Sequence, residues 1–346
     1  MNEWYLNAAS EPNQAYRNSA QAHTDNLTKP KGSLGALETM AITLAGLQST
    51  NTPSIKHPVI RIFAADHGVA QEGVSAFPQA VTEQMVRNFS NGGAAICVLA
   101  GQINAQFQVV NVGTVSSIES LPNVSDQRVA AGTRNFTQSE AMDTDQLLTA
   151  LSVGKQTVDS LDVVDCFIGG EMGIANTTSA TAVACALLGK SPATLVGRGT
   201  GVTDDGLAHK THVIEKALKT HQHRLNNPLA ILQVLGGFDI AALCGAYICA
   251  AQQSIPVLVD GFICSVAALV AVHLNPSIRP WLLFSHQSKE AGHEMVLQHL
   301  QAQPLLKLGL CLGEGSGAAT ALPMLQMACA VHNEMASFDS AGVSRN

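Results

Sequence analysis

The sequence is poor in charged and in aromatic side chains. Only 13% of its 346 residues are Asp, Glu, Lys or Arg and only 4% are aromatic, whereas 46% are hydrophobic. A protein of average composition carries charge on about a quarter of its residues, so neutral polar and small apolar side chains must cover much of this surface. The hydrophobic content is ample for a large core. We therefore predict a folded globular protein, and a buried oligomer interface would explain the low charge.

Basic runs are absent as well. The formal net charge is -7, and the 19 Lys and Arg residues are scattered along the chain. Nucleic acids and anionic membrane surfaces bind clustered positive charge, so neither is expected as the main partner. An anionic ligand would have to be held by local donors.

Signals for metal binding, secretion and membrane insertion are also lacking. The eight cysteines form no CxxC pair and have no histidine at zinc-site spacing, so we interpret them as reduced core residues of a cytosolic protein. The start, MNEWYLNAASEPN, has no basic region followed by an apolar run. One apolar stretch, residues 255–274, resembles a membrane span, but Pro256, Asp260 and Gly261 interrupt it. We interpret it as a buried strand followed by a buried helix.

From residue 58 onward, short β-branched runs alternate with segments of helical character. Continuous apolar runs are typical of strands that are covered on both faces. The five runs are PVIRIFAAD, AQFQVVNVG, VVDCFIGG, IPVLVDG and WLLFSH. Strands that alternate with helices indicate parallel βαβ units, so the sequence predicts an α/β fold with a doubly wound, mostly parallel sheet.

The two ends of the chain differ from this middle part. Residues 1–55 are polar and contain Leu37, Met40, Leu44 and Leu47 at helical spacing. The segment after about residue 315 also has helical character, and we expect it to pack beside the N-terminal helices. The predicted division is a small helical domain from residues 1–55 and about 315–346, and a large α/β domain from residues 56–314.

Polar residues follow several of the predicted strands. Ligands of doubly wound sheets collect at the carboxyl ends of the strands. The residues at these positions are Asp66 and His67, then Glu171, then Asp260, and finally Ser285 with His286. The pair Asp66 and His67 suits a metal, a proton relay or a structural hydrogen bond, and the sequence leaves these three open.

Two glutamates occupy similar positions. Glu171 in GGEMGIANTTSA and Glu314 in GEGSG each follow glycine and precede a helical segment rich in small residues. Glycine permits close approach of the backbone to another group. Two such acids at strand ends suggest a pair that shares acid–base work, with plain surface placement as the alternative.

Two glycine-spaced loops could hold a phosphate through backbone N–H groups, namely GRGTG at 197–201 and GEGSG at 313–317. Neither continues as a Walker A loop or fits a dinucleotide fingerprint, so plain turns remain an alternative. Lys210 could pair with a phosphate or be a solvated helix lysine. TDDG at 203–206 lacks a preceding strand, so we interpret it as a capped helix start.

Taken together, many segments resemble the nicotinate-nucleotide:dimethylbenzimidazole phosphoribosyltransferase family along nearly the whole chain. These segments are LTKPKGSLGALE, AADHGV, NGGAAICVLA, GEMGIANTTSA, GRGTG, GGFDIAAL, PVLVDGF, SHQSKEAG and LGEGSGAA. The resemblance implies transfer of 5-phosphoribose from nicotinate mononucleotide to 5,6-dimethylbenzimidazole or a related base. The products would be α-ribazole 5′-phosphate, formed with inversion, and nicotinate, in the synthesis of the lower ligand of cobalamin.

The same resemblance implies roles for individual residues. Glu314 matches the family's catalytic general base, and as a free carboxylate of pKa about 4.3 it would be ionised at neutral pH. Glu171 is similar to the second acid. The positions implied for the ribose phosphate and the nicotinate are Gly173, Gly199, Lys210, Ser288 and Gly315.

The base pocket is expected near SAFPQAVTEQM, where Phe77 and Met85 stand at positions that are polar in some family members. A more apolar pocket follows, which leaves benzimidazole, purine and phenolic bases open. Ala36 departs from the arginine of the family motif. The family also implies a homodimer, a Rossmann-like large domain with a small helical domain formed from both chain termini, and no metal or redox cofactor.

Two other functions compete with this one. A metal-dependent hydrolase could use Asp66, His67, Asp260 and His286 around an ion. A non-catalytic nucleotide sensor could keep the phosphate loops without turnover. Neither explains why both glycine-flanked glutamates occur beside the other matched segments.

Overall fold

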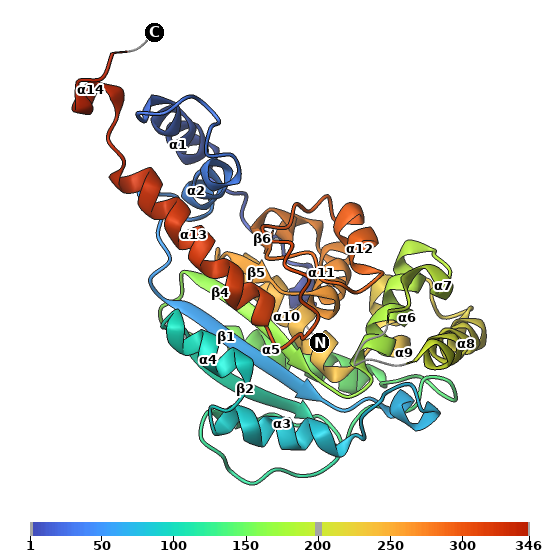
Figure 1. Ribbon diagram of the computed structural model, residues 1–346. Helices are drawn as coiled ribbons and strands as arrows, with labels where there is room; N and C mark the ends of the chain where they lie inside the picture. The colour runs from blue at the N-terminus through green and yellow to red at the C-terminus, as the bar shows by residue number, and fades with distance from the viewer. Residues whose placement is uncertain (1–2, 198–202, 345–346) are drawn as a thin grey trace.

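The computed structural model describes residues 3–197 and 203–344 (Figure 1). Within them, one parallel sheet has the strand order β3-β2-β1-β4-β5-β6. The strands are β1 (Pro58–Ala65), β2 (Gln106–Gly113), β3 (Val124–Asp126), β4 (Cys166–Met172), β5 (Val257–Val259) and β6 (Leu282–Phe284). This order is that of the doubly wound Rossmann sheet, with its switch point between β1 and β4. The predicted fold class is confirmed.

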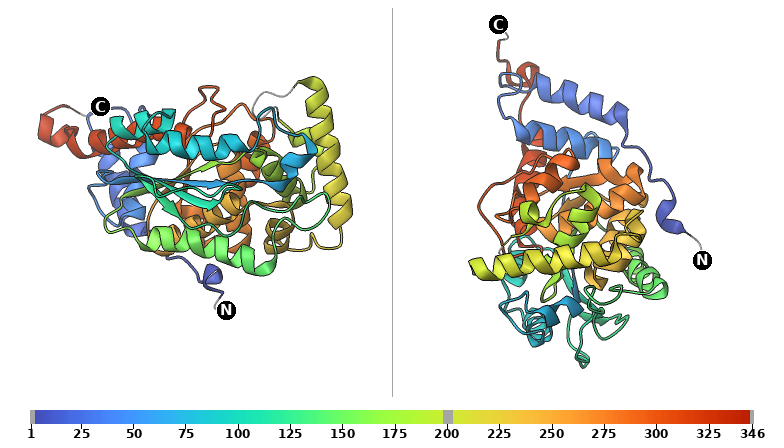
Figure 2. Two further views of the ribbon diagram at one scale, coloured as in Figure 1. Left: turned by 90° about the horizontal axis from the view of Figure 1, so that it is seen from below. Right: turned by 90° about the vertical axis from the view of Figure 1, so that its right-hand side faces the viewer.

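Helices cover both faces of the sheet (Figure 2). Those of the middle part are α3 (Ala80–Ser90), α4 (Ala95–Gln102), α5 (Thr144–Asp159), α6 (Asn176–Leu188), α7 (Pro192–Leu195), α8 (Asp204–His221), α9 (Pro228–Leu235), α10 (Phe238–Gln252), α11 (Phe262–Leu274) and α12 (His293–His299). The left view of Figure 2 shows α3 and α4 on one face and α5 on the other. All eight residues of β1 are buried, as the continuous apolar run predicts.

Glycines let α5 and α10 pack very closely. A Cβ on Gly154 of α5 would lie 1.9 Å from the main-chain oxygen of Ala242, and one on Gly245 of α10 would lie 2.1 Å from that of Leu151. Only backbone without side chains fits at these two points. Helix α10 of this pair packs against β1, β2 and β4, and α5 packs on α10.

The terminal helices lie together at one end of the molecule (Figure 1). They are α1 (Gln14–Asn26), α2 (Ala36–Leu47), α13 (Ser316–Glu334) and the short α14 (Phe338–Ala341). Helix α13 packs against α2 at one side and against α4, β4 and β5 at the other. It therefore connects the terminal helices to the sheet, while the division into two domains stays a prediction.

Three short 3-10 helices complete the described elements, η1 (Trp4–Leu6), η2 (Gly68–Glu72) and η3 (Pro276–Trp281). The apolar stretch at 255–274 forms β5 and α11, as predicted, and within the described ranges no helix has both the length and the apolar character of a membrane span. The TDDG segment starts α8, where the Thr203 hydroxyl oxygen accepts the main-chain N–H of Gly206. The predicted capped helix start is confirmed.

Candidate active site

A pocket of about 700 Å³ opens at the carboxyl ends of β4, β5 and β6. Its walls come from the residues after each of these strands, from the loop before α13 and from Phe77. Among the lining residues are Glu171 and Glu314. The structure thus brings the two glutamates to one cavity, at the edge of the sheet where doubly wound folds bind ligands.

The backbone around Glu314 is unusual. Gly313, Glu314 and Gly315 all have positive φ, at 84°, 61° and 73°. A Cβ on Gly313 would lie 2.4 Å from Glu171 Oε1, so glycine is required there. A glutamate in the left-handed region is strained by about 1 kcal/mol or more, and such strain concentrates at functional sites. The turn points the chain from the pocket wall directly into α13.

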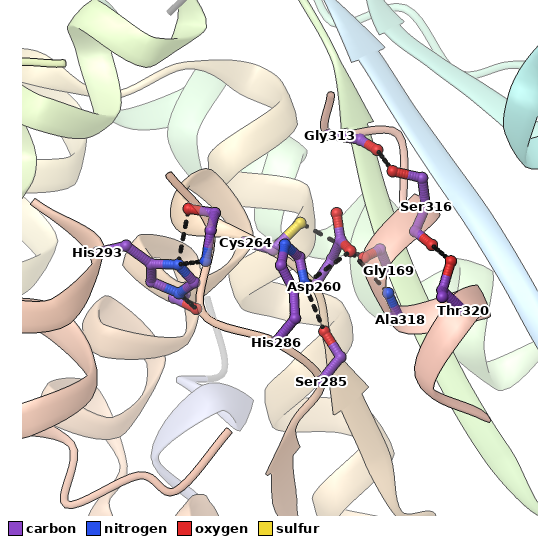
Figure 3. Close-up of polar contacts among 12 residues, drawn as sticks. Gly169, Asp260, Cys264, Ser285, His286, His293, Gly313, Ser316, Ala318 and Thr320 are labelled. Carbon is purple, nitrogen blue, oxygen red and sulfur yellow. Dashed lines mark hydrogen bonds and ion pairs between the residues drawn. The ribbon is translucent and has the colours of Figure 1, made fainter. Parts of the chain in front are cut away.

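Asp260 secures this turn from the neighbouring strand end. Its Oδ1 accepts the main-chain N–H of Ala318 at 2.8 Å, and the Ser316 hydroxyl donates to the Gly313 carbonyl oxygen at 2.6 Å (Figure 3). A carboxylate at a helix N-terminus interacts favourably with the unpaired N–H groups there. The first turn of α13 is thereby held beside the pocket.

Glu314 is buried, with only 7% of the residue exposed. Burial, and then the negative charge of Asp260, raise its pKa to about 7. The expectation of an ordinary free carboxylate is therefore wrong: a large fraction of Glu314 carries a proton at neutral pH. Among the described residues, no protein donor forms a hydrogen bond with its carboxylate, so the group is available to a ligand.

Glu171 is buried as well, which rules out its plain surface placement. Asn176 donates a hydrogen bond from Nδ2 to Glu171 Oε2, and the same Nδ2 lies 3.3 Å from Asp239 Oδ2. Burial, and next the charge of Asp239, raise the pKa of Glu171 well above its usual range. Both glutamates of the pocket therefore favour the protonated form more than free glutamate does.

Asp66 and His67 make structural contacts. Asp66 Oδ2 accepts the main-chain N–H of Val115 at 2.8 Å. His67 is fully buried, with Nδ1 2.7 Å from Ser179 Oγ and Nε2 3.0 Å from Asp239 Oδ1. Neither side chain lines the pocket. Both side chains thus make structural hydrogen bonds, while their use in a proton relay stays a prediction.

The other two residues of the hydrolase alternative, Asp260 and His286, lie beside each other. His286 Nδ1 lies 3.0 Å from Ser285 Oγ and 3.9 Å from Asp260 Oδ1 (Figure 3). In the described ranges, no three His, Cys, Asp or Glu side chains gather as a metal site would need. The four residues of the hydrolase alternative thus do not surround one point.

Lys210 is buried in α8. Its Nζ donates to Thr177 Oγ1 at 2.9 Å and lies 3.4 Å from the Gly197 carbonyl oxygen. Burial lowers its pKa to about 8, against an opposing effect of Glu290. The solvated-lysine alternative is wrong. Lys210 does not itself line the pocket, but Thr177 does.

The other predicted site residues divide into three groups. Gly173, Ser288 and Phe77 line the pocket. Gly315 and Met85 do not: Gly315 caps α13 behind Glu314, and Met85 packs against the core from α3. Gly199 lies outside the described residues. Ala36 is exposed at the start of α2.

Sequence reasoning missed Asp239 and Asn176. Asp239 follows two glycines at the start of α10 in GGFDIAAL, the same pattern that singled out Glu171. Asn176 carried no comparable signal, because its contact with Glu171 depends on how β4 turns into α6. Ala175 makes this turn with a φ of 73°.

Comparisons with known proteins agree with this geometry. Residues 9–343 match a family model described as Phosphoribosyltransferase. A protein of Pseudomonas syringae pv. syringae (strain B728a), named nicotinate-nucleotide–dimethylbenzimidazole phosphoribosyltransferase, is 55% identical over 99% of this chain and 98% of its own length. A protein of the same name from Pseudomonas aeruginosa (strain UCBPP-PA14) is 53% identical over the same shares.

The chain belongs to this phosphoribosyltransferase family. The solved structures agree, since the crystal structure of CobT from Thermus thermophilus superposes with a TM-score of 0.93 at 39% identity. That match covers 96% of this chain and 100% of the other. The resemblance that the sequence motifs indicated is thereby confirmed over nearly the whole chain. The family is one of transferases.

Proposed function

We propose that this protein transfers the 5-phosphoribosyl group of nicotinate mononucleotide to 5,6-dimethylbenzimidazole or a related base. The products are nicotinate and α-ribazole 5′-phosphate, for the lower ligand of cobalamin. The names of the relatives at 53–55% identity support this reaction. The observation that carries it is Glu314, a buried carboxyl of pKa about 7 that faces an apolar cavity without a protein donor.

Glu314 is the general base in this proposal. One ring nitrogen of the benzimidazole attacks C1′ of the ribose while the bond from C1′ to the pyridinium nitrogen of nicotinate breaks. The attacking ring must then lose the proton from its other nitrogen, and the Glu314 carboxylate accepts it. A base is most effective when its pKa lies near the working pH, and a pKa of about 7 meets that condition. Attack from the face opposite the leaving group gives the α product.

The phosphate end of the donor is assigned to the opposite side of the pocket. Gly173 and Ser288 line it, and Lys210 reaches its wall through Thr177. Because Thr177 Oγ1 accepts from the Lys210 ammonium group, its own hydroxyl hydrogen is free to point elsewhere. Thr177 also lies in the first turn of α6, where main-chain N–H groups favour an anion.

Glu171 supports Glu314 rather than acting as a second ionised base. Burial and the charge of Asp239 raise its pKa and favour a protonated carboxyl beside Gly313, against the hydrogen bond from Asn176, which favours the ionised form. A neutral neighbour limits the repulsion that Glu314 meets when it ionises.

The aromatic base is assigned to the apolar part of the cavity, lined by Phe77, Phe262 and Leu312 among others. Flat apolar rings bind in such surfaces, and the few polar groups fix their orientation. Phe77 is half exposed, at 51%, so a bound base would cover it. We further propose a homodimer located in the cytoplasm, supported by the low content of charged residues and by the free cysteines. Six of the eight cysteines are buried, whereas Cys97 is half-buried and Cys311 is exposed, so the prediction of a core position is wrong for Cys311.

Incubation of the purified protein with nicotinate mononucleotide and dimethylbenzimidazole tests the reaction. Chromatography should detect nicotinate and α-ribazole phosphate in equal amounts. Nicotinate without the ribazole product would instead indicate hydrolysis, and binding without either product would indicate the sensor. Both results would contradict the proposal.

A Glu314→Gln variant tests the base. Gln has the same shape but cannot accept the proton, so turnover should fall about a hundredfold or more while affinity for nicotinate mononucleotide changes little. Near-normal turnover would remove Glu314 from the mechanism.

A further inference from the structure

His293 is the first residue of α12 and is fully buried, five residues beyond Ser288 of the pocket wall. Its Nδ1 accepts the main-chain N–H of Ser288 at 2.9 Å and lies 2.8 Å from Ser288 Oγ. On the other side of the ring, Nε2 lies 3.0 Å from Ser265 Oγ in α11. The imidazole thus joins the loop after β6 to the helix after β5, which are two walls of one cavity.

The hydrogen bonds define the tautomer of His293. A main-chain N–H can only donate, so Nδ1 must carry a lone pair, and the ring hydrogen is then on Nε2 and points to Ser265. Burial, and the neighbouring His286, lower the pKa of His293 to about 3. The ring is therefore neutral throughout the working range of pH and acts as a fixed acceptor, with no part in proton transfer.

This acceptor controls the Ser288 hydroxyl group. The main-chain N–H of Glu290 lies 3.3 Å from Ser288 Oγ and donates to it. His293 Nδ1 has one lone pair, and the Ser288 main-chain N–H already donates to it. The Ser288 hydroxyl hydrogen can therefore form only a shared hydrogen bond with this nitrogen. An anionic oxygen in the pocket would be a stronger acceptor for the hydroxyl hydrogen. Because Ser288 lines the pocket, its hydroxyl can donate to an anion that binds there.

We propose that His293 is a positioning residue for phosphoribosyl transfer, because its Nδ1 atom holds the Ser288 main chain and hydroxyl in the wall that binds the phosphoribosyl donor. This inference rests on the proposed function. It goes beyond that function because His293 does not line the pocket and acts through Ser288. Since Ser288 contacts a part of the donor that does not react, its loss should weaken binding in the ground state and the transition state alike.

A double-mutant cycle between His293→Phe and Ser288→Ala tests the inference. His293→Phe keeps a planar ring and removes both nitrogens. We expect it to raise KM for nicotinate mononucleotide about tenfold with kcat within about twofold of the unsubstituted enzyme, the pattern of lost uniform binding. In the Ser288→Ala background, the same change should add less than about twofold, because coupled residues are not additive.

His293→Asn serves as the conservative variant, since an Asn side-chain oxygen can accept the Ser288 N–H near the place of Nδ1, and it should recover most of the loss in KM. It also serves if the Phe variant fails to fold. His299→Phe is the matched control: His299 ends the same helix, is exposed and pairs with His273, so KM should not change.

The inference would be overturned if His293→Phe raised KM by the same factor with and without the Ser288 hydroxyl. It would also be overturned if His293→Phe lowered kcat and left KM unchanged. Absence of turnover in the unsubstituted protein would instead overturn the proposed function, and this inference with it. The two failures are therefore distinguishable.

Discussion

The raised pKa of Glu314 makes the reaction sensitive to acid. If its carboxylate is the base, kcat/KM follows the ionised fraction of Glu314 in the free enzyme. With a pKa of about 7, that fraction is about 90% at about pH 8 and about 1% at about pH 5. The rate constant should therefore fall about a hundredfold over this range. For a glutamate with the ordinary pKa of 4.5, the ionised fraction would fall by less than about half between these two pH values.

Initial rates of nicotinate release at low nicotinate mononucleotide concentration measure this profile. The residual activity of Glu314→Gln serves as the reference, because its profile contains only the titration of the substrates and of other groups. Lys210, with a pKa of about 8, should add a decline at higher pH in both enzymes. A profile of the unsubstituted enzyme that coincides in shape with the Glu314→Gln reference would refute the assignment.

Asp260→Asn tests the electrostatic cause of the shift. The Asn oxygen can still accept the Ala318 N–H, but the negative charge that helps to raise the pKa of Glu314 is gone. The acid limb of the profile should therefore move to lower pH. Asp145→Asn, the same change at an exposed position in the first turn of α5, should leave the limb in place. An unmoved limb in Asp260→Asn would show that burial alone sets the pKa.

Three further predictions concern other residues of the site. Lys210→Met should raise KM for nicotinate mononucleotide about tenfold in steady-state assays with little change in kcat, and an unchanged KM would exclude it from the phosphate end. Phe77→Ser should lower kcat/KM for dimethylbenzimidazole relative to adenine about three- to tenfold in competition assays, and an unaltered ratio would place the base elsewhere. The raised pKa of Glu171 means that its protonated form favours the folded state, so stability is lost as pH rises through that pKa. Glu171→Gln cannot ionise, and it should melt with the unsubstituted protein at acid pH but at a higher temperature at alkaline pH; coincident melting throughout would contradict a raised pKa.

The sheet could be predicted because its central strands are covered on both faces. Five of the six strands follow from continuous apolar runs, and the order along the sheet follows the rules for parallel βαβ units. The sixth strand, β3, has only three residues, two half-buried and one exposed, so no hydrophobic pattern marks it. Helix α5 carries a local sequence signal of another kind, since Asp143 and Gln146 form a capping box at its start.

Positions in the site could be predicted where a residue type is unusual for its place in the chain. Glu171 and Glu314 stand out because a charged residue beside glycine is unusual in an otherwise apolar stretch. Only Glu171 belongs to a strand, since no strand of the described residues directly precedes Glu314, so the expectation that both acids stand at strand ends is wrong for Glu314. Met85 was assigned to the pocket by its neighbourhood in sequence, but its helix turns the side chain toward the core. The contact of His293 with Ser288 depends on the path of a loop, which local sequence does not specify.

The pKa of Glu314 is the property of the site that the sequence predicts least, because it depends on which segments the fold brings together around this carboxyl group. Glu171 and Asp260 come from two different segments, and the fold buries both in the wall of the pocket that contains Glu314, with no Lys or Arg side chain among the described residues that line it. Such a wall destabilises added negative charge and stabilises positive charge. In the proposed reaction, positive charge lies on the pyridinium ring and develops on the ribose C1′ as the bond to nicotinate breaks. The same burial that keeps Glu314 partly protonated at neutral pH would therefore favour the proposed transition state, with Lys210 and the start of α6 proposed to hold the phosphate.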